Sequence, residues 1–222
     1  MFIVIVGGGK VGYYLIKSLI PHNHKIVVFD PVAEICHKIA NELNIPVING
    51  DGTDIDKLTK IGLSDADIFI AVTGKDEDNL IACQLAKKNF GVKRTIARVN
   101  NPKNITVFER LGVDIAVSST SIITDLIEQE VDDSGIKTIM KLKKGKIVLT
   151  EIDVRSTHAI CDKLLKDIQL PRDCILISII RDDEIIIPNG YTMIKSGDCI
   201  IAATSKEKQQ ELKEYFLKSR KL

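Results

Sequence analysis

The chain of 222 residues contains no tryptophan and only 5% aromatic residues, and it has no apolar run long enough to cross a membrane as a helix. Its longest apolar runs, residues 68–72 and 174–180, fall far below the roughly 18 to 20 residues that such a helix needs. No positively charged segment precedes the first apolar stretch, so a secretory signal is not expected either. With 45% hydrophobic residues, the chain can form a substantial core. We therefore expect a soluble globular protein that does not insert into a membrane.

An excess of charge of either sign is also lacking. The chain has 31 basic and 30 acidic residues, which leaves a net charge of +1. This balance provides no general attraction for nucleic-acid backbones or anionic lipid, so nucleic-acid binding is not expected. We interpret the one basic cluster as the solvated tip of a hairpin; its members are Lys141, Lys143, Lys144 and Lys146.

The five cysteines form no C-x-x-C pair. An odd number of cysteines, mostly in apolar surroundings, is typical of reduced thiols in a cytoplasmic protein. The combinations that could bind a metal are His22 and His24 with Cys36 or His37, and His158 with Cys161. None of them has a typical zinc spacing, so no metal site is predicted.

A glycine motif follows the first apolar run. Residues 2–6 are uniformly apolar, and residues 7–12 read G-x-G-x-x-G, with Lys10 and Val11 between the second and third glycines. In a dinucleotide fold, Gly7 allows the tight turn, Gly9 lets the backbone approach a pyrophosphate, and Gly12 lets the next helix pack closely. The alternative is an ordinary strand-to-helix turn.

Apolar runs of strand length alternate with segments of helical spacing over the first 117 or so residues. The expected strands are residues 2–6, 26–29, 46–48, 68–72, 95–99 and 115–117. The expected helices are residues 11–20, 33–43, 55–61, 79–90 and 105–111. This pattern predicts an α/β domain with a doubly wound, parallel, Rossmann-like sheet.

We place the end of this domain at residue 135, after an amphipathic helix over residues 121–131. The apolar stripe of this helix could cover its own sheet or face a second copy of the chain. Residues 136–222 are expected to form a second, smaller α+β domain. Its predicted elements are hairpins 138–142/147–154 and 175–181/184–188, a helix capped by Ser156 or Thr157 and ending near Asp167, a strand 199–203, and a final helix from Lys206 with a basic tail at 218–222.

Polar residues lie where the predicted strands of the first domain end. Asp30 is placed to accept hydrogen bonds from both ribose hydroxyls and to repel a 2′-phosphate, or alternatively to cap the next helix. Asp51 and Gly52 end the third strand, where a turn and a cap near Asp54 are the alternative. Thr73 ends the fourth strand ahead of Asn79, which is expected to open a helix, and Arg98 ends the fifth. The sequence thus predicts a ligand crevice at this edge of the sheet.

Residues that could catalyse a reaction beside this crevice are not apparent. Tyr13 and Lys17 have the spacing of a dehydrogenase pair, but they lie on the helix after the glycine motif, and Tyr191 and Lys195 repeat the spacing in the second domain. The histidines have no visible orienting carboxylate. A nucleotide site without chemistry beside it favours a sensor over an enzyme.

Both halves of the chain resemble one known family. Gly7–Gly12, Asp30, residues 50–52, 71–73 and 97–99 resemble the N-terminal regulator-of-potassium-conductance (RCK) domain. Residues 152–154, 170–172, 179–181, 187–188 and 196–198 resemble the C-terminal domain of the same proteins, the TrkA-type subunits of Trk/Ktr potassium uptake systems.

The resemblance implies a cytoplasmic regulatory subunit, peripheral to the inner face of the membrane, whose dimers assemble into a ring that binds a potassium translocator in the membrane. The crevice would bind NAD(H) or an adenine nucleotide: ATP, ADP or AMP. Glycines 7, 9 and 12 would hold phosphates, Asp30 the ribose, and Asp51 with Gly52 the adenine, with Thr73 and Arg98 as further candidates.

Two departures from the family pattern bear on the ligand. ATP-gated members usually have arginine where this chain has Lys10, and an acidic residue where it has Ser118, Ser119 and Thr120. A lysine can meet a phosphate as a point charge but lacks the forked geometry of arginine. NAD(H), ADP and AMP therefore remain open. The rival functions are a small NAD-dependent oxidoreductase and a redox-responsive transcription regulator, for which no basic recognition helix is visible.

Overall fold

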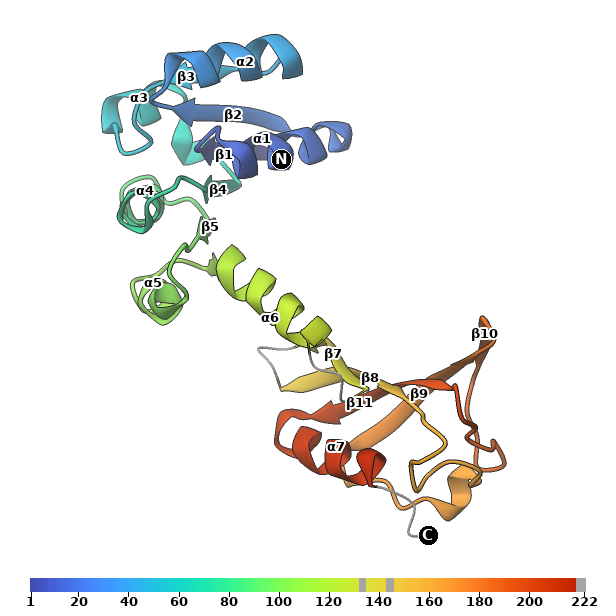
Figure 1. The fold of residues 1–222 in the computed structure, drawn as a ribbon. Helices are drawn as coiled ribbons and strands as arrows, with labels where there is room; N and C mark the ends of the chain where they lie inside the picture. Colours follow the sequence, from blue (N-terminus) through green and yellow to red (C-terminus); the bar gives the residue numbers. More distant parts are fainter. Residues whose placement is uncertain (132–134, 143–145, 219–222) are drawn as a thin grey trace. The chain divides into compact units, whose positions relative to one another are not determined.

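A computed structural model describes residues 1–131, 135–142 and 146–218 of the chain (Figure 1). It contains two compact units, Met1–Thr124 and Asp125–Leu222, which are described separately below. Among the described residues, no helix combines the length and the apolar character that crossing a membrane requires.

The first unit contains a six-stranded parallel sheet. Its strands are β1 (Phe2–Val6), β2 (Lys25–Asp30), β3 (Val47–Asn49), β4 (Ile68–Ala71), β5 (Arg94–Arg98) and β6 (Ile115–Val117). Their order is β3-β2-β1-β4-β5-β6, so the order reverses at β1, between β2 and β4. The predicted doubly wound parallel sheet is confirmed, with no strand end shifted by more than one residue.

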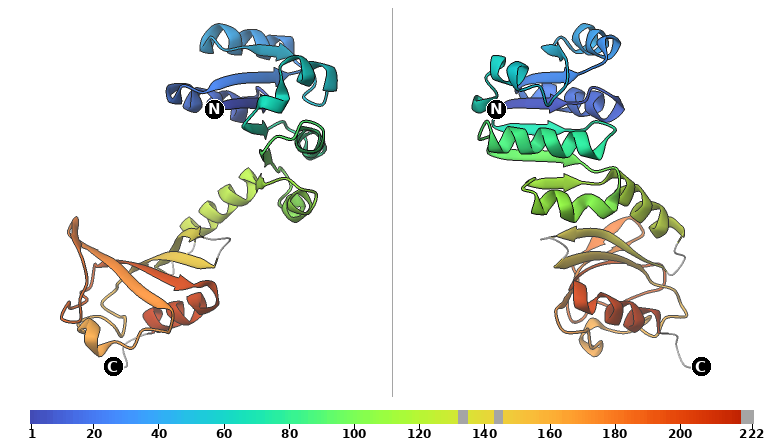
Figure 2. Two further views of the ribbon diagram at one scale, coloured as in Figure 1. Left: turned by 180° about the vertical axis from the view of Figure 1, so that it is seen from behind. Right: turned by 90° about the vertical axis from the view of Figure 1, so that its left-hand side faces the viewer.

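Helices cover both faces of this sheet (Figure 2). The side chains of each strand point alternately to one face and the other, so they contribute to two separate cores. Phe2, Val4 and Val6 pack with buried side chains of α3 (Ile55–Lys60), α4 (Asp76–Lys88) and α5 (Ile105–Arg110). Ile3 and Ile5 pack with α1 (Lys10–Leu19) and α2 (Ala33–Leu43) on the other face. All five residues of β1 are buried, which explains why this strand appears in the sequence as an unbroken apolar run.

Helix α6 (Ser119–Val131) begins two residues before the predicted start and crosses the division between the two units. The predicted apolar stripe is present. Its members are each more than half exposed; they are Ile122, Ile123, Leu126, Ile127 and Val131. The domain boundary predicted at residues 135/136 stays a prediction.

The second unit contains a five-stranded antiparallel sheet of order β10-β9-β11-β8-β7. The strands are β7 (Ile136–Leu142), β8 (Ile147–Asp153), β9 (Cys174–Arg181), β10 (Glu184–Ile186) and β11 (Cys199–Ser205). Helix α7 (Gln209–Leu217), which follows a 3₁₀ turn at Lys206–Lys208, contributes Leu212 and Phe216 to the core. Both predicted hairpins are confirmed. Lys143 and Lys144 of the predicted basic tip, and residues 219–222 of the basic tail, lie outside the described residues.

The helix predicted from Ser156 or Thr157 to Asp167 is wrong. This segment is irregular apart from a 3₁₀ turn at Leu165–Asp167. Its amides bond to a distant loop: Asp162 donates to the carbonyl of Ile194 at 2.8 Å and Lys166 to that of Gly190 at 2.9 Å. Asp162 also has a positive φ of 63°, which a helix does not allow. Pairing with the 190–194 loop has replaced the hydrogen bonds of a helix.

Candidate functional site

A cleft of about 490 Å³ lies at the carboxyl edge of the parallel sheet, where the strand order reverses. Nine of the ten residues predicted for the site line it, namely Gly7, Gly9, Lys10, Val11, Asp30, Asp51, Gly52, Thr73 and Arg98. The tenth, Gly12, is not part of the lining. In open α/β sheets, ligands bind in this kind of crevice.

The three motif glycines have different structural roles. Gly7 has a φ of +104°, and a Cβ there would lie 2.9 Å from the amide nitrogen of Thr73. A Cβ on Gly12 would overlap the carbonyl oxygen of Gly7, so Gly12 is needed for α1 to approach β1. A Cβ on Gly9 would meet no atom within 4 Å. Gly7 and Gly12 thus shape the turn, whereas Gly9 faces open space.

The N-terminus of α1 provides an electropositive floor for the cleft. Gly9 is the N-cap residue, no side chain caps the helix, and the first turn contains no acidic residue. The first intrahelical bond runs from the amide of Tyr13 to the carbonyl of Gly9, which leaves the preceding amides without a helical acceptor. Such a helix end attracts anions, and Lys10 adds a full positive charge.

Asp30 ends β2 and is only 5% exposed. Its Oδ2 accepts a hydrogen bond from the amide of Gly8 at 2.7 Å, and its Oδ1 accepts one from the amide of Val32 at 2.9 Å. The carboxylate does not bond to the N-terminal turn of α2, whose N-cap is Val32. Asp30 therefore ties the glycine loop to β2, and each oxygen retains a lone pair that could accept from a ligand hydroxyl.

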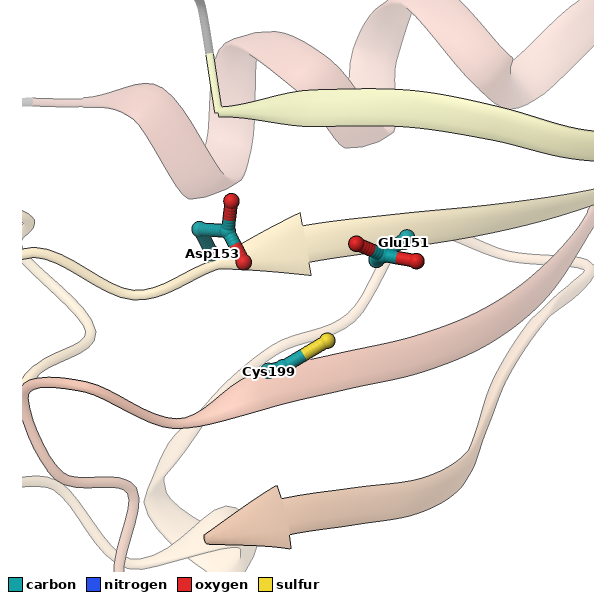
Figure 3. Close-up of side chains that lie close together, drawn as sticks. All are labelled: Glu151, Asp153 and Cys199. Carbon is teal, nitrogen blue, oxygen red and sulfur yellow. The ribbon is translucent and has the colours of Figure 1, made fainter. Parts of the chain in front are cut away.

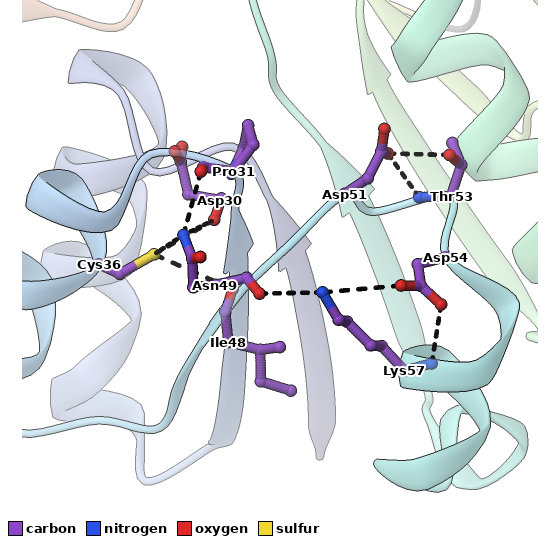
Figure 4. A network of polar contacts seen from close by, with 9 residues as sticks. All are labelled: Asp30, Pro31, Cys36, Ile48, Asn49, Asp51, Thr53, Asp54 and Lys57. Carbon is purple, nitrogen blue, oxygen red and sulfur yellow. Dashed lines mark hydrogen bonds and ion pairs between the residues drawn. The ribbon is translucent and has the colours of Figure 1, made fainter.

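The end of β3 is organised by a polar network (Figure 4). Asn49 donates from Nδ2 to the carbonyls of Asp30 at 3.3 Å and Pro31 at 3.0 Å. Asp51 accepts from the amide and the hydroxyl of Thr53 through Oδ1 alone, and the cap of α3 is Asp54. The sequence analysis missed Asn49, although its place one residue before Gly50 was visible.

The ends of β4 and β5 are joined by Asn79. Its side chain is fully buried; Oδ1 accepts from the amide of Thr73 at 2.9 Å, and Nδ2 donates to the carbonyls of Thr73 at 3.2 Å and Arg98 at 2.9 Å. The expectation that Asn79 opens the next helix is wrong, because α4 begins at Asp76. The acidic first turn at residues 76–78 extends the helix toward its N-terminus.

Charges in the cleft are distributed along the sheet edge. The acidic Asp30 ends β2, and Asp51 lies two residues after β3. The basic Lys10 is the first residue of α1, and Arg98 ends β5. Lys75 and Asp78 also line the cleft and were not predicted. Lys75 directly follows Gly74 as the N-cap of α4, and Asp78 lies in the first turn of that helix. Nε of Arg98 is buried and has no hydrogen-bond partner in the described part of the chain. An anionic group that bonds to this guanidinium would fit the site.

The tyrosine–lysine pairs do not contribute to the cleft. Tyr13 donates its hydroxyl to Glu42 at 2.6 Å, and the ring of Tyr191 lies under Nζ of Lys166 at 4.7 Å. Neither tyrosine is among the lining residues.

One cluster in the second unit was also missed by the sequence analysis, which weighed only sets containing histidine. Glu151, Asp153 and Cys199 lie within 4.8 Å of one another because β8 pairs with β11 (Figure 3). Burial, together with the two carboxylates, raises the pKa of the Cys199 thiol to about 11.

Comparisons with known protein families match both parts of the chain. Residues 3–119 match the model of the TrkA-N domain, and residues 149–217 match that of the TrkA-C domain. A Trk system potassium uptake protein trkA homolog from Methanosarcina mazei is 34% identical over 96% of this chain. The chain spans 54% of the length of that relative. The Trk system potassium uptake protein TrkA of Mycobacterium tuberculosis is 30% identical over 99% of this chain and all of its own length.

Solved structures share the fold at lower identity. The GsuK channel bound to NAD is 19% identical, with a TM-score of 0.63 over 100% of this chain and 40% of its own. GsuK bound to ADP is 24% identical, with a TM-score of 0.54 over 60% of this chain and 35% of its own. The AMP-bound Kef CTD of Shewanella denitrificans is 20% identical, with a TM-score of 0.51 over 59% of this chain and 79% of its own. These likenesses confirm the predicted fold.

Proposed function

The chain belongs to the TrkA family, and from this premise we propose that it is a nucleotide-sensing regulatory subunit that gates a membrane potassium translocator of Trk/Ktr type. The observation that carries the proposal is the cleft at the reversal of strand order, lined by nine of the ten residues expected to bind a nucleotide. Its volume of about 490 Å³ is typical of small-molecule sites.

The order of the strands gives the orientation of the ligand in this proposal. Along the carboxyl edge, β3 and β2 place Asp51 and Asp30 on one side of the glycine loop, and β4 and β5 place Thr73 and Arg98 on the other. Adenine and ribose then lie beside Asp51, Gly52 and Asp30, and the phosphates lie at the N-terminus of α1 with Lys10. NAD(H), ADP and AMP fit this arrangement, in keeping with the NAD, ADP and AMP named for the structural neighbours.

The remaining features of the proposal concern organisation and location. Residues 1–135 act as the nucleotide-binding domain and residues 136–222 as a separate C-terminal domain. The protein forms homodimers that assemble into a ring, and the ring binds the translocator at the inner face of the membrane from the cytoplasm. Support comes from the relatives named as potassium uptake proteins and from the exposed apolar stripe of α6.

Gating by such a subunit is a shift between two conformations of unequal ligand affinity. A ligand that binds one cleft geometry 10 to 100 times more tightly supplies only about 1.4 to 2.7 kcal/mol per site. Several coupled clefts in a ring add these contributions, which explains why a regulatory subunit of this kind benefits from assembly.

The test is calorimetric titration of Asp30→Asn with ADP, NAD and NADP. We expect affinity for ADP and NAD to fall roughly 10- to 100-fold, because charged hydrogen bonds to the ribose are lost. NADP should lose less, because the substitution also removes the repulsion of its 2′-phosphate. The matched control is Asp54→Asn, since Asp54 caps α3 outside the cleft lining and asparagine also caps helices.

Two results would contradict the proposal. Unchanged affinity of the Asp30 variant would show that this carboxylate serves only to hold the glycine loop. Steady oxidation or reduction of NAD(H) with a small alcohol or carbonyl compound, followed at 340 nm, would favour the oxidoreductase instead.

A further inference from the structure

Asn79 is a fully buried polar residue inside a helix, and the proposed binding roles do not use it. It lies in the fourth position of α4, on the face that packs against the sheet beside Ala82 and Cys83. Asparagine is a poor helix former and a costly residue to bury. A residue of this kind in a core is satisfied by hydrogen bonds, so the location of its partners indicates its role.

All three hydrogen bonds of the Asn79 side chain go to the rim of the cleft. Two of them hold the backbone of Thr73, through its amide and its carbonyl, and the third holds the carbonyl of Arg98. Thr73 follows β4 and Arg98 ends β5, so one side chain fixes the spacing of two neighbouring strand ends. Both residues line the cleft on the side of the glycine loop away from Asp30.

This far side of the cleft is suited to a second phosphoryl group. It carries the cationic side chains of Lys75 and Arg98 beside one carboxylate, that of Asp78, and the buried Nε of Arg98 has no partner among the described residues. A guanidinium donates hydrogen bonds to phosphate through a rigid, planar fork. The strength of this contact therefore depends on how accurately the backbone of the arginine is positioned. Asn79 bonds to that backbone.

We propose that Asn79 is a positioning residue that holds Thr73 and Arg98 where they bind the second phosphoryl group, and that it thereby makes the cleft prefer ADP and NAD over AMP. This inference rests on the proposed nucleotide site and specifies which class of nucleotide the site prefers. AMP, with one phosphate at the N-terminus of α1, does not reach the residues that Asn79 positions.

The experiment compares AMP, ADP and NAD by calorimetric titration of the wild type and of Asn79→Leu, whose side chain has the same branched shape, is somewhat larger and forms no hydrogen bonds. We expect ADP and NAD to bind roughly ten times more weakly to the variant, and AMP affinity to change less than about three-fold. The matched control is Thr95→Val. Thr95 is also fully buried and polar, but it lies near the start of β5 and bonds to Asp114, away from the cleft.

A second measurement separates positioning from general loss of stability. If Asn79 acts in part through Arg98, the double variant Asn79→Leu/Arg98→Ala should lose less ADP affinity than the sum of the losses in the two single variants. Should Asn79→Leu fail to fold, Asn79→Asp keeps an acceptor for the amide of Thr73 but places a carboxylate against two carbonyls, and the same selective loss of ADP and NAD is expected.

The outcomes are distinguishable. Equal losses for AMP and ADP, additive effects in the double variant, or the same selective loss in Thr95→Val would overturn the inference and leave the nucleotide site standing. If the wild type bound none of the three nucleotides, the proposed function would fail together with the inference.

Discussion

At the scale of single residues, the glycine motif combines two physical requirements that the sequence pattern alone does not separate. Gly12 is required because a side chain there would overlap the carbonyl of Gly7, so its role is packing of α1 on β1. Gly9 has free space around its Cβ position and an ordinary φ of −61°. The absence of a side chain at Gly9 therefore leaves room for a ligand to reach the N-terminal amides of α1.

This difference predicts opposite phenotypes for two alanine substitutions. Gly12→Ala should lower the free energy of unfolding by about 3 kcal/mol, because it overpacks the contact between helix and strand. Gly9→Ala should change it by less than about 1 kcal/mol, since an N-cap glycine is replaced without a clash. Gly9→Ala should nevertheless weaken ADP binding roughly ten-fold, because the methyl group occupies the approach to the helix amides.

Urea denaturation followed by circular dichroism, with calorimetric titration of each variant, checks both values. The two substitutions are each other's control, as they differ only in place within one motif. Full ADP affinity in a stable Gly9→Ala protein would contradict the binding role of the α1 N-terminus.

At the scale of secondary structure, the first unit could be predicted from the sequence because its central strands are buried on both faces. β1 is buried along its whole length, and such strands stand out as unbroken apolar runs between polar turns. The segment 155–168 could not be predicted, because its hydrogen bonds go to residues 190–194, and no local pattern records that pairing. Its capping serine and threonine favoured a helix that tertiary contacts replaced.

In the candidate site, too, some residues could be predicted from the sequence and others could not. Asp30 and Asp51 could be identified because their position at a strand end is visible in the sequence and places them at the edge of the sheet. Asn49 and Asn79 could not, because their role depends on how far their side chains reach across to neighbouring strand ends. Residues that line the cleft were easier to predict than the residues whose hydrogen bonds hold the strand ends in place.

In the second unit, an ion pair between the partly exposed Arg181 and the buried Asp198 joins β9 to the turn before β11, and it allows a prediction about stability. Arg181 donates from Nε and a terminal nitrogen to the carboxylate of Asp198 at 2.7 and 2.8 Å, and the amide of Lys195 donates to the same group. Burial alone would raise the pKa of Asp198, but the hydrogen bonds from Arg181 and Lys195 outweigh it, and the pKa is lowered. Asp198→Asn should lower the free energy of unfolding by about 2 to 3 kcal/mol.

The sign of the pH dependence follows from the lowered pKa. The folded protein holds the Asp198 proton less tightly than the unfolded chain, whose aspartate has a pKa near about 3.9. The contribution of the charged Asp198 to the free energy of unfolding is therefore complete above that value. It is lost as the pH falls through the lower pKa that Asp198 has in the folded state. The free energies of unfolding of wild type and variant, measured in urea, should differ by a constant amount from about pH 5 to 8. This difference should shrink below about pH 4.

The control for this pair is Asp183→Asn, because Asp183 lies in the β9–β10 turn with a φ of +65°, which asparagine also adopts readily. A difference between wild type and Asp198→Asn that grew on acidification would show that the carboxylate is not held in its charged form.

At the scale of the whole molecule, α6 presents an apolar surface larger than isolated side chains would explain. Its five exposed apolar residues recur at helical spacing and form one stripe, with Leu126 at its centre. Contiguous apolar patches of this kind on soluble proteins typically mark interaction sites. A stripe that covered its own sheet would be buried within the chain, whereas all five side chains are exposed. This exposure supports the proposal that the stripe faces a second copy of the chain.

If the stripe forms the interface of the proposed dimer, the double substitution Ile123→Asp/Leu126→Asp should convert that dimer into a monomer with little change in melting temperature. The two charges would then lie between chains and not in the core of one chain. Sedimentation velocity over a range of protein concentrations measures the association state, and Glu128→Gln on the same helix is the matched control. A variant that stayed dimeric but melted at a much lower temperature would show that the stripe packs within its own chain. If the variant is monomeric, titration with ADP tests whether the cleft residues of a single chain suffice for binding. On the proposal each monomer should still bind ADP, and only the coupling between clefts should be lost.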